Sequence, residues 1–500
     1  MNGKMIVRIA VVLLLSLVLV GCGDTDSEVK DSVTIGVSYL ATSMDPQGYD
    51  TQITESILSN AYEPLVRVDA DGGIIPGAAK EWDISPDGMV YTFTLYEDMF
   101  FHDGTPVTAE DAGFSLQRCI DSSYVGTYFS YIDKIEAPDD LTLVVTLDYA
   151  YAPFLSLAGA YSGITSKSYV EENEDPFLRQ TMGSGPYEFV SYTQGDSMVF
   201  KAFDKYHLDK APIANLVYKM TPNAASAALA LKNGELDVLV GVDSTNRAQI
   251  ESDDNLVLSS TQSLMSSLLA FNCDKEPFND PKVRMAMVLA IDKNQINEAA
   301  TDGYATIADS HIPKGVVGYS ADDKTPAKDI EKAKELLAEA GYADGFDFQL
   351  VTTTARSAHA EVALANLYEL GVTVKTDVVE TAAFYELLEK GQFDAYMGGW
   401  GYICPDPDVY VYDMFHSEKT STGNYVRFNS SAVDQYLEEA RYATSEEDRQ
   451  KAYENAMTII RDEVPNIPII WNDANIAFNK DLKGAKAINT EQYFIYNYSW

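Results

Sequence analysis

Basic side chains are scarce in this chain of 500 residues. It has 36 lysines and arginines against 76 aspartates and glutamates, which gives a formal net charge of −40 at pH 7. Because a phosphate backbone requires a basic protein face, this imbalance argues against nucleic-acid binding. It indicates a well-solvated acidic surface, with electrostatic steering of cationic ligands as the alternative interpretation.

Histidine and cysteine are also rare, with five and four copies. Three cysteines, Cys119, Cys273 and Cys404, are far apart and form no C-x-x-C motif, so we expect no zinc site and at most one disulfide among them. His416 beside Glu418 could hold one metal ion, but a surface pair is the favoured interpretation. We therefore expect no bound metal.

Motifs for catalysis are missing as well. The sequence has no G-x-S-x-G elbow, no phosphate-binding loop and no G-x-G-x-x-G. His102-Asp103 is the nearest approach to an acid–base pair, but adjacent residues on an extended chain point to opposite faces. We expect no catalytic residues and no cofactor, and hence a protein that is not an enzyme.

The N-terminus lacks a run long enough to cross a membrane. Lys4 and Arg8 precede roughly twelve apolar residues that end at Val20, whereas a spanning helix needs about 20. The segment Leu19-Val20-Gly21-Cys22 resembles the end of a bacterial lipoprotein signal peptide. This resemblance implies a signal peptide over 1–21, lipidation of Cys22, and a flexible tether over 22–32. Two acyl chains would anchor an extracytoplasmic protein to the cell membrane.

Alternating apolar residues predict strands in the first part of the chain. The segments 33–40, 89–101 and 141–150 each place apolar side chains on one face, as in Tyr91, Phe93 and Leu95. We expect the segments 89–101 and 141–150 to be half-buried strands of a mostly antiparallel sheet, and 33–40 to be an opening strand that runs into a loop.

Helical patterns alternate with strands in the second part. Helices are predicted over 279–292, with Asp280 as cap, over 326–342, ending at Gly341, and from Ser445 to just before Pro465. Strands are predicted between and after them, at 346–353, 372–379, 393–400 and 467–471. This alternation is typical of an α/β lobe, and the chain length predicts two or three domains.

A series of short motifs identifies a family. The segment 62–118 contains Tyr62-Glu63-Pro64-Leu65, Phe101-His102-Asp103-Gly104-Thr105-Pro106 and Thr108-Ala109-Glu110-Asp111, and further matches follow at 183–187, 231–239, 277–293, 398–408, 433–441 and 464–471. In these motifs the sequence resembles the family 5 extracellular solute-binding proteins, the peptide and nickel group that supplies ABC importers. The resemblance covers nearly the whole chain after the signal segment.

The resemblance implies an α/β fold of the periplasmic-binding-protein type, a clam shell of two α/β lobes joined by a hinge. It implies a discontinuous lobe I over 33–65, 181–268 and 478–500, an inserted domain over 66–180, and lobe II over 269–477. The chain crossings near 266–272 and 475–480 would form the hinge.

The implied function is that of a monomeric receptor, which captures an oligopeptide-like ligand and delivers it to an ABC transporter permease. An oligosaccharide or a metal chelate as ligand is the first alternative, because sugar rings would stack on aromatic side chains. A surface-anchored hydrolase is the second alternative, although the sequence offers no pair of nucleophile and base.

Glycines and aromatic residues are the candidate ligand-binding positions. Gly183, Gly185, Gly399 and Gly401 would let backbone groups pair with an extended ligand as an added strand, unless they only form turns. The aromatic candidates would form apolar walls with polar tips, unless they belong to the core; they are Tyr39, Tyr124, Trp400 and Tyr402.

One of these positions departs from the family pattern. Peptide-binding members typically have Trp-x-x-Asp here, and the aspartate pairs with the α-ammonium group of the ligand. This chain has Ile403 in that place. A buried ammonium needs a carboxylate partner, so either another acid, such as Asp406 or Asp408, takes the role or the ligand has no free amino terminus there.

Overall fold

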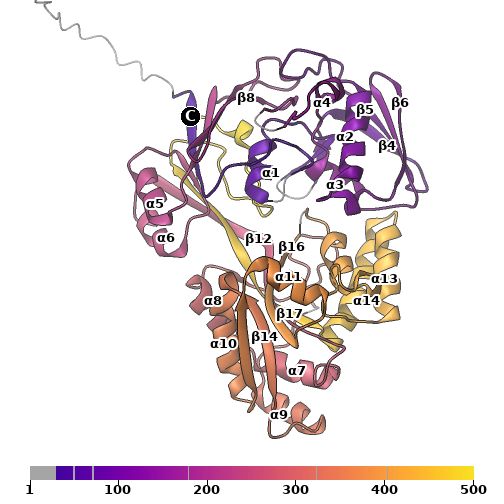
Figure 1. Ribbon diagram of the computed structural model, residues 1–500, viewed down its shortest axis with the longest axis vertical. Helices are drawn as coiled ribbons and strands as arrows, with labels where there is room; N and C mark the ends of the chain where they lie inside the picture. The colour runs from indigo at the N-terminus through magenta and orange to yellow at the C-terminus, as the bar shows by residue number, and fades with distance from the viewer. Residues whose placement is uncertain (1–29, 49–50, 70–72, 178–179, 323, 403) are drawn as a thin grey trace, which may run out of the picture. The chain divides into compact units, whose positions relative to one another are not determined.

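The computed structural model describes residues 30–48, 51–69, 73–177, 180–322, 324–402 and 404–500 (Figure 1). The predicted signal peptide, the lipidated Cys22 and the ligand-binding candidate Ile403 lie outside these residues. The described cysteines Cys119, Cys273 and Cys404 are free thiols. No helix within the described residues is long and apolar enough to cross a membrane.

The largest sheet of the described residues has 11 strands. In spatial order ten of them are β15 (Thr373–Val379), β14 (Asp347–Thr353), β16 (Ala395–Gly401), β12 (Leu256–Phe271), β17 (Asn466–Asn479), β11 (Val238–Val240), β1 (Ser32–Val37), β10 (Asn215–Met220), β9 (Ser197–Ala202) and β8 (Tyr187–Thr193). The short β13 (Thr306–Ile307) pairs with β17. Parallel pairs such as β1 with β10 and β14 with β15 adjoin antiparallel ones, so the sheet is mixed.

Two long antiparallel strands, β12 and β17, connect the two halves of this sheet (Figure 1). One end of β17 pairs with β11 through 476–478, and the far end of β12 pairs with β16 through 265–271. Between these ends the β12–β17 register shifts, between Gln262 and Ser266. The change of partners lies close to the crossings predicted as a hinge.

A separate four-stranded sheet lies between β3 and β8 in the chain. Its strands β4 (Ala79–Ile84), β5 (Val90–Leu95), β7 (Thr142–Leu147) and β6 (Ile132–Asp139) are all antiparallel. Strands β5 and β7 lie in the segments 89–101 and 141–150, where the sequence predicts such strands. Tyr91, Phe93 and Leu95 alternate inward, and Phe154 meets Tyr91 edge to face at 4.7 Å between ring centroids. The helices α2 (Ala109–Asp121) and α3 (Phe154–Tyr161) contribute to the same core, and β2 (Val66–Val68) pairs with β3 (Ile74–Pro76) nearby.

The predicted helices form, with boundaries set by their caps. Asp280 caps α7 (Pro281–Ala290), and Ser445 caps α14 (Glu446–Glu463), which ends before Pro465. The helix expected from 326 begins four residues later, because Asp329 caps α9 (Ile330–Glu339). The remaining helices are α1 (Gln52–Leu58), α4 (Lys167–Glu172), α5 (Ala224–Lys232), α6 (Ser244–Glu251), α8 (Lys293–Thr301), α10 (Ser357–Tyr368), α11 (Thr381–Glu389), α12 (Asp413–Phe415) and α13 (Ser431–Tyr442).

Predicted strands also form, with shifted ends. The strand expected over 33–40 is β1 and ends at Val37, so Tyr39 lies beyond it. The short strand expected over 467–471 is part of the 14-residue β17. Pairing with β12 extends this strand well beyond the apolar segment 467–471, and the local sequence pattern alone does not reveal this extension.

Candidate functional site

Strand β16 has an edge that its neighbour leaves uncovered. Strand β14 pairs with β16 only from Leu350 opposite Ala395 to Thr352 opposite Met397. Beyond Met397, on the side away from β12, the segment 398–401 has no strand partner among the described residues. A sheet edge of this kind can accept an extended chain.

The backbone groups of two glycines point toward this edge. The amide of Tyr402 donates to the carbonyl of Leu264 at 3.0 Å, which makes these residues a hydrogen-bonded pair of the β12–β16 ladder. Such pairs alternate along an antiparallel ladder, so Gly399 and Gly401 direct their N–H and C=O groups away from β12. The geometry leaves these groups free to pair with a ligand strand.

A cavity of about 430 Å³ opens beside this edge. Its wall includes Gly399, Trp400 and Gly401, so the structure brings together three of the residues predicted from the sequence. The other lining residues come from separate parts of the chain and are Tyr128, Met265, Thr353, Ala355, Arg356, Thr381, Phe384, Tyr385, Gly398 and Val409. Most of this wall is apolar or aromatic, which suits an organic ligand.

Arg356 is the one charged side chain among those lining residues, and sequence analysis missed it. It forms no ion pair among the described residues, and its buried Nε has no hydrogen-bond partner there. Burial lowers the pKa of this guanidinium, with an opposing contribution from Tyr385. The group lies so near Gly399 that a Cβ there would come within 2.8 Å of Nη2.

This arginine can bind a carboxylate. A guanidinium offers five donors in a planar fork that matches carboxylate geometry, and this half-buried one makes no ion pair among the described residues. The only sequence signal was an arginine between strand β14 and helix α10, which is too general to single it out.

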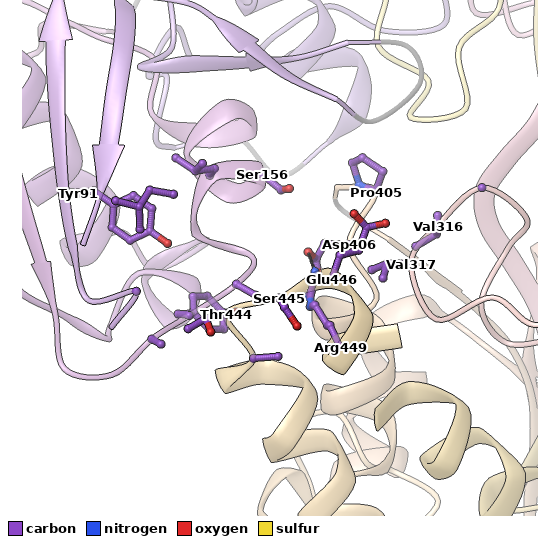
Figure 2. A pocket seen from close by; sticks show the side chains of 18 of the residues that line it. Tyr91, Ser156, Val316, Val317, Pro405, Asp406, Thr444, Ser445, Glu446 and Arg449 are labelled. Carbon is purple, nitrogen blue, oxygen red and sulfur yellow. Dashed lines mark hydrogen bonds and ion pairs between the residues drawn. The ribbon is translucent and has the colours of Figure 1, made fainter. Parts of the chain in front are cut away.

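A second and larger cavity, of about 1000 Å³, has a buried ion pair in its wall. Figure 2 shows Asp406, Arg449 and Glu446 on one wall and Tyr91 and Ser156 across from them. Arg449 donates to both carboxylate oxygens of Asp406, at 2.8 and 2.6 Å. The buried charge of Asp406 is therefore satisfied within the protein.

Asp408 is engaged in the same way. Arg441 donates to its two oxygens at 2.9 and 2.8 Å, and the Tyr151 hydroxyl donates to it at 3.0 Å. Asp406 and Asp408, the two acids that could replace an aspartate at position 403, are therefore both paired with arginines. A ligand ammonium would have to displace a bidentate ion pair to reach either one.

The other aromatic candidates do not line these two cavities. Tyr402 is buried, stacks on Tyr410 with 4.5 Å between ring centroids, and donates its hydroxyl to the carbonyl of His311. It therefore has the role of a core residue. Tyr39 and Tyr124 are exposed, by 39% and 53%.

The glycine candidates Gly183 and Gly185 lie against the backbone after α1. A Cβ at Gly183 would come within 2.1 Å of the Ala61 carbonyl oxygen, and one at Gly185 within 2.6 Å of the Ala61 carbonyl carbon. The amide of Gly185 donates to that same carbonyl oxygen. Close packing of two chain segments explains why these positions are glycine.

Comparison with known proteins agrees with this architecture. Residues 73–422 match the family model "Bacterial extracellular solute-binding proteins, family 5 Middle". The chain is 30% identical to heme-binding protein A of Haemophilus influenzae, over 82% of this chain and 81% of that protein. It is 27% identical to the dipeptide-binding protein of Escherichia coli, over 82% and 83% of the two chains.

A solved structure shares the fold over most of its length. The periplasmic binding protein DppA of Helicobacter pylori, in complex with peptide STSA, superposes with a TM-score of 0.80 and 28% identity, over 94% of this chain and 98% of that one. The α/β architecture predicted from the sequence is thereby confirmed as that of a periplasmic binding protein. The chain belongs to family 5 of the bacterial extracellular solute-binding proteins.

Proposed function

We propose that this protein is the extracytoplasmic receptor of an ABC importer and that it captures an oligopeptide-like ligand, which it delivers to the membrane permease. The observation that carries the proposal is the uncovered β16 edge at 398–401 beside the unpaired Arg356. An extended peptide added to this edge would exchange backbone hydrogen bonds with Gly399 and Gly401.

The position of Arg356 sets the orientation of a bound peptide along β16. A peptide carboxylate would pair with Arg356, while its backbone follows β16 toward the loop at 404–408. Main-chain pairing does not depend on side-chain identity, so many sequences would be accepted. Two of the relatives reported above carry names or bound molecules of peptide type, which supports this ligand class.

The protein acts by binding and release, with no covalent step. Affinity that differs between open and closed arrangements would select the loaded receptor for docking on the permease. The monomer is the expected form, since each chain carries a complete edge and cavity. Cys22 would carry the lipid anchor, and release of a Cys22→Ala variant into the medium tests it.

Mass spectrometry of the protein under native conditions, as purified, tests the ligand class. A ladder of masses with amino-acid spacing, together with a thermal shift on adding random tetrapeptides, is the expected result. Hexose spacing or a bound metal chelate would move the assignment to one of the alternative ligands. Turnover of a peptide or glycoside would restore the hydrolase.

A further inference from the structure

A third, small cavity holds a buried acid that makes no ion pair among the described residues. Glu55 in α1 is 7% exposed and lines a cavity of about 60 Å³. Its carboxylate accepts a hydrogen bond from Gln492, and the neighbouring Ser56 hydroxyl accepts one from the Tyr493 amide at 2.9 Å. The segment that contains Gln492 and Tyr493 is thus bonded to α1, and Gln492 holds the carboxyl of Glu55.

The nearby arginine does not neutralise Glu55. Arg67 lines the same cavity but donates to both carboxylate oxygens of Glu63, at 2.6 and 2.5 Å. Among the described residues Glu55 has no ion pair, and burial raises its pKa from 4.5 to about 8. The remaining titratable groups around it are Tyr62, Tyr161, Cys404 and Tyr496. None of these carries a positive charge that would offset the effect of burial, and a pKa of about 8 leaves most of this carboxyl protonated at neutral pH.

Residues that follow β16 in the chain contribute to the wall of this cavity. Gly401 lines the 430 Å³ cavity, whereas Cys404 and Pro405 line the small one. Pro405 also lines the 1000 Å³ cavity, so a ligand group held there would lie next to the cavity that contains Glu55. The volume has room for an ammonium group and a few water molecules.

We propose that Glu55 is the specificity-determining residue that receives the cationic end of the ligand. The proposal rests on the peptide function above and adds that the ligand carries a free ammonium group. It also supplies an acid where position 403 has none. On binding, Glu55 gives its proton to solvent, and the resulting carboxylate pairs with the ammonium, donor to acceptor.

Retention of two peptide pools tests this assignment. Random tetrapeptides with free amino termini, and the same pool after N-acetylation, are incubated with the protein and separated by ultrafiltration. Mass spectrometry of the retained fraction should show a preference for free amines on the order of tenfold or more. Glu55→Gln, which keeps the side-chain shape, should abolish the preference, and the control Glu446→Gln on the wall of the large cavity should keep it.

The outcomes separate the two proposals. Equal retention of both pools by the unaltered protein, or an unchanged preference in Glu55→Gln, overturns the role of Glu55 and leaves peptide binding standing. Retention of neither pool overturns peptide binding itself, and the role of Glu55 with it.

Proton release provides a second readout. The most strongly retained tetrapeptide is titrated at pH 6.5 by calorimetry in buffers of different ionisation enthalpy. Binding should release close to one proton in the unaltered protein and none in Glu55→Gln, because only Glu55 changes its protonation state. The same release from both proteins contradicts the proposal.

Discussion

Arg449 donates two hydrogen bonds, of 2.8 and 2.6 Å, to the carboxylate of Asp406. The pair lies at the wall of the 1000 Å³ cavity, and both side chains are almost fully buried. This pair decides what the Asp-Pro-Asp segment after β16 does in this protein. It neutralises a carboxylate that would otherwise be a candidate ligand contact, and it ties that segment to α14.

Breaking this pair should destabilise the protein strongly. Arg449→Met leaves the buried Asp406 charge without a partner, which typically costs about 3–5 kcal/mol of unfolding free energy. Urea unfolding measures the change. The control is Lys210→Met, which breaks the exposed, solvent-screened pair with Asp204 and should leave stability nearly unchanged. Equal losses in the two variants contradict the buried-pair account.

Replacing Arg356 should weaken binding of peptides with a free carboxylate. Arg356→Met removes the guanidinium fork beside Gly399, and we expect a loss of about tenfold or more in affinity. The same peptides with amidated C-termini should bind both proteins alike, as measured by calorimetry. Because the guanidinium has no acidic partner in the described residues, thermal stability without peptide should not fall. An equal loss for amidated peptides would argue that Arg356 acts only through packing.

Adding a methyl group at Gly183 should be costly. The nearest atom to the new Cβ would be the Ala61 carbonyl oxygen, which is backbone and cannot rotate aside. We expect Gly183→Ala to lose about 2 kcal/mol or more of unfolding free energy. Gly195→Ala is the matched control: its surroundings are open, and its positive φ of 72° alone should cost about 1 kcal/mol. If Gly183→Ala unfolds at the same denaturant concentration as the control, close packing is not the reason for this glycine.

Acid should weaken the fold through His311. Burial lowers the pKa of this imidazole from 6.5 to about 4, and its Nε2 contacts the Asn466 side chain. Between pH 6.5 and 4 the unfolded chain binds a proton that the folded protein does not. The unfolding free energy should therefore fall as the pH falls, by up to about 1.4 kcal/mol per pH unit for this group. Above pH 6.5 the contribution should be constant.

The matching variant is His311→Gln, which cannot titrate but can still donate to Asn466. Its stability should fall less steeply than that of the unaltered protein as the pH is lowered from 6.5. Parallel curves for the two proteins would rule out His311 as the titrating group.

Local pattern predicted much of the fold because caps and alternation act over a few residues. Asp280, Ser445 and the inward alternation of Tyr91, Phe93 and Leu95 all appear where the sequence places them. Local pattern is less informative where segments far apart in the sequence set a residue's surroundings. Tyr402 was a candidate ligand wall with a core role as the alternative, and in the structure it is buried and stacks on Tyr410. The predicted domain boundaries and the lipidated Cys22 remain predictions.

The sequence by itself determined the family, the α/β class and the glycine-rich segment 398–401, because these depend on short motifs and periodicity. Only the tertiary structure decided which residues surround the segment 398–401 and the buried Glu55. Strand β14 stops pairing at Met397, Arg356 meets Gly399, and Glu55 lies in a cavity bounded by Cys404. Such contacts join residues tens to hundreds of positions apart. The role of a buried titratable side chain depends on these surrounding residues, which the local sequence does not show.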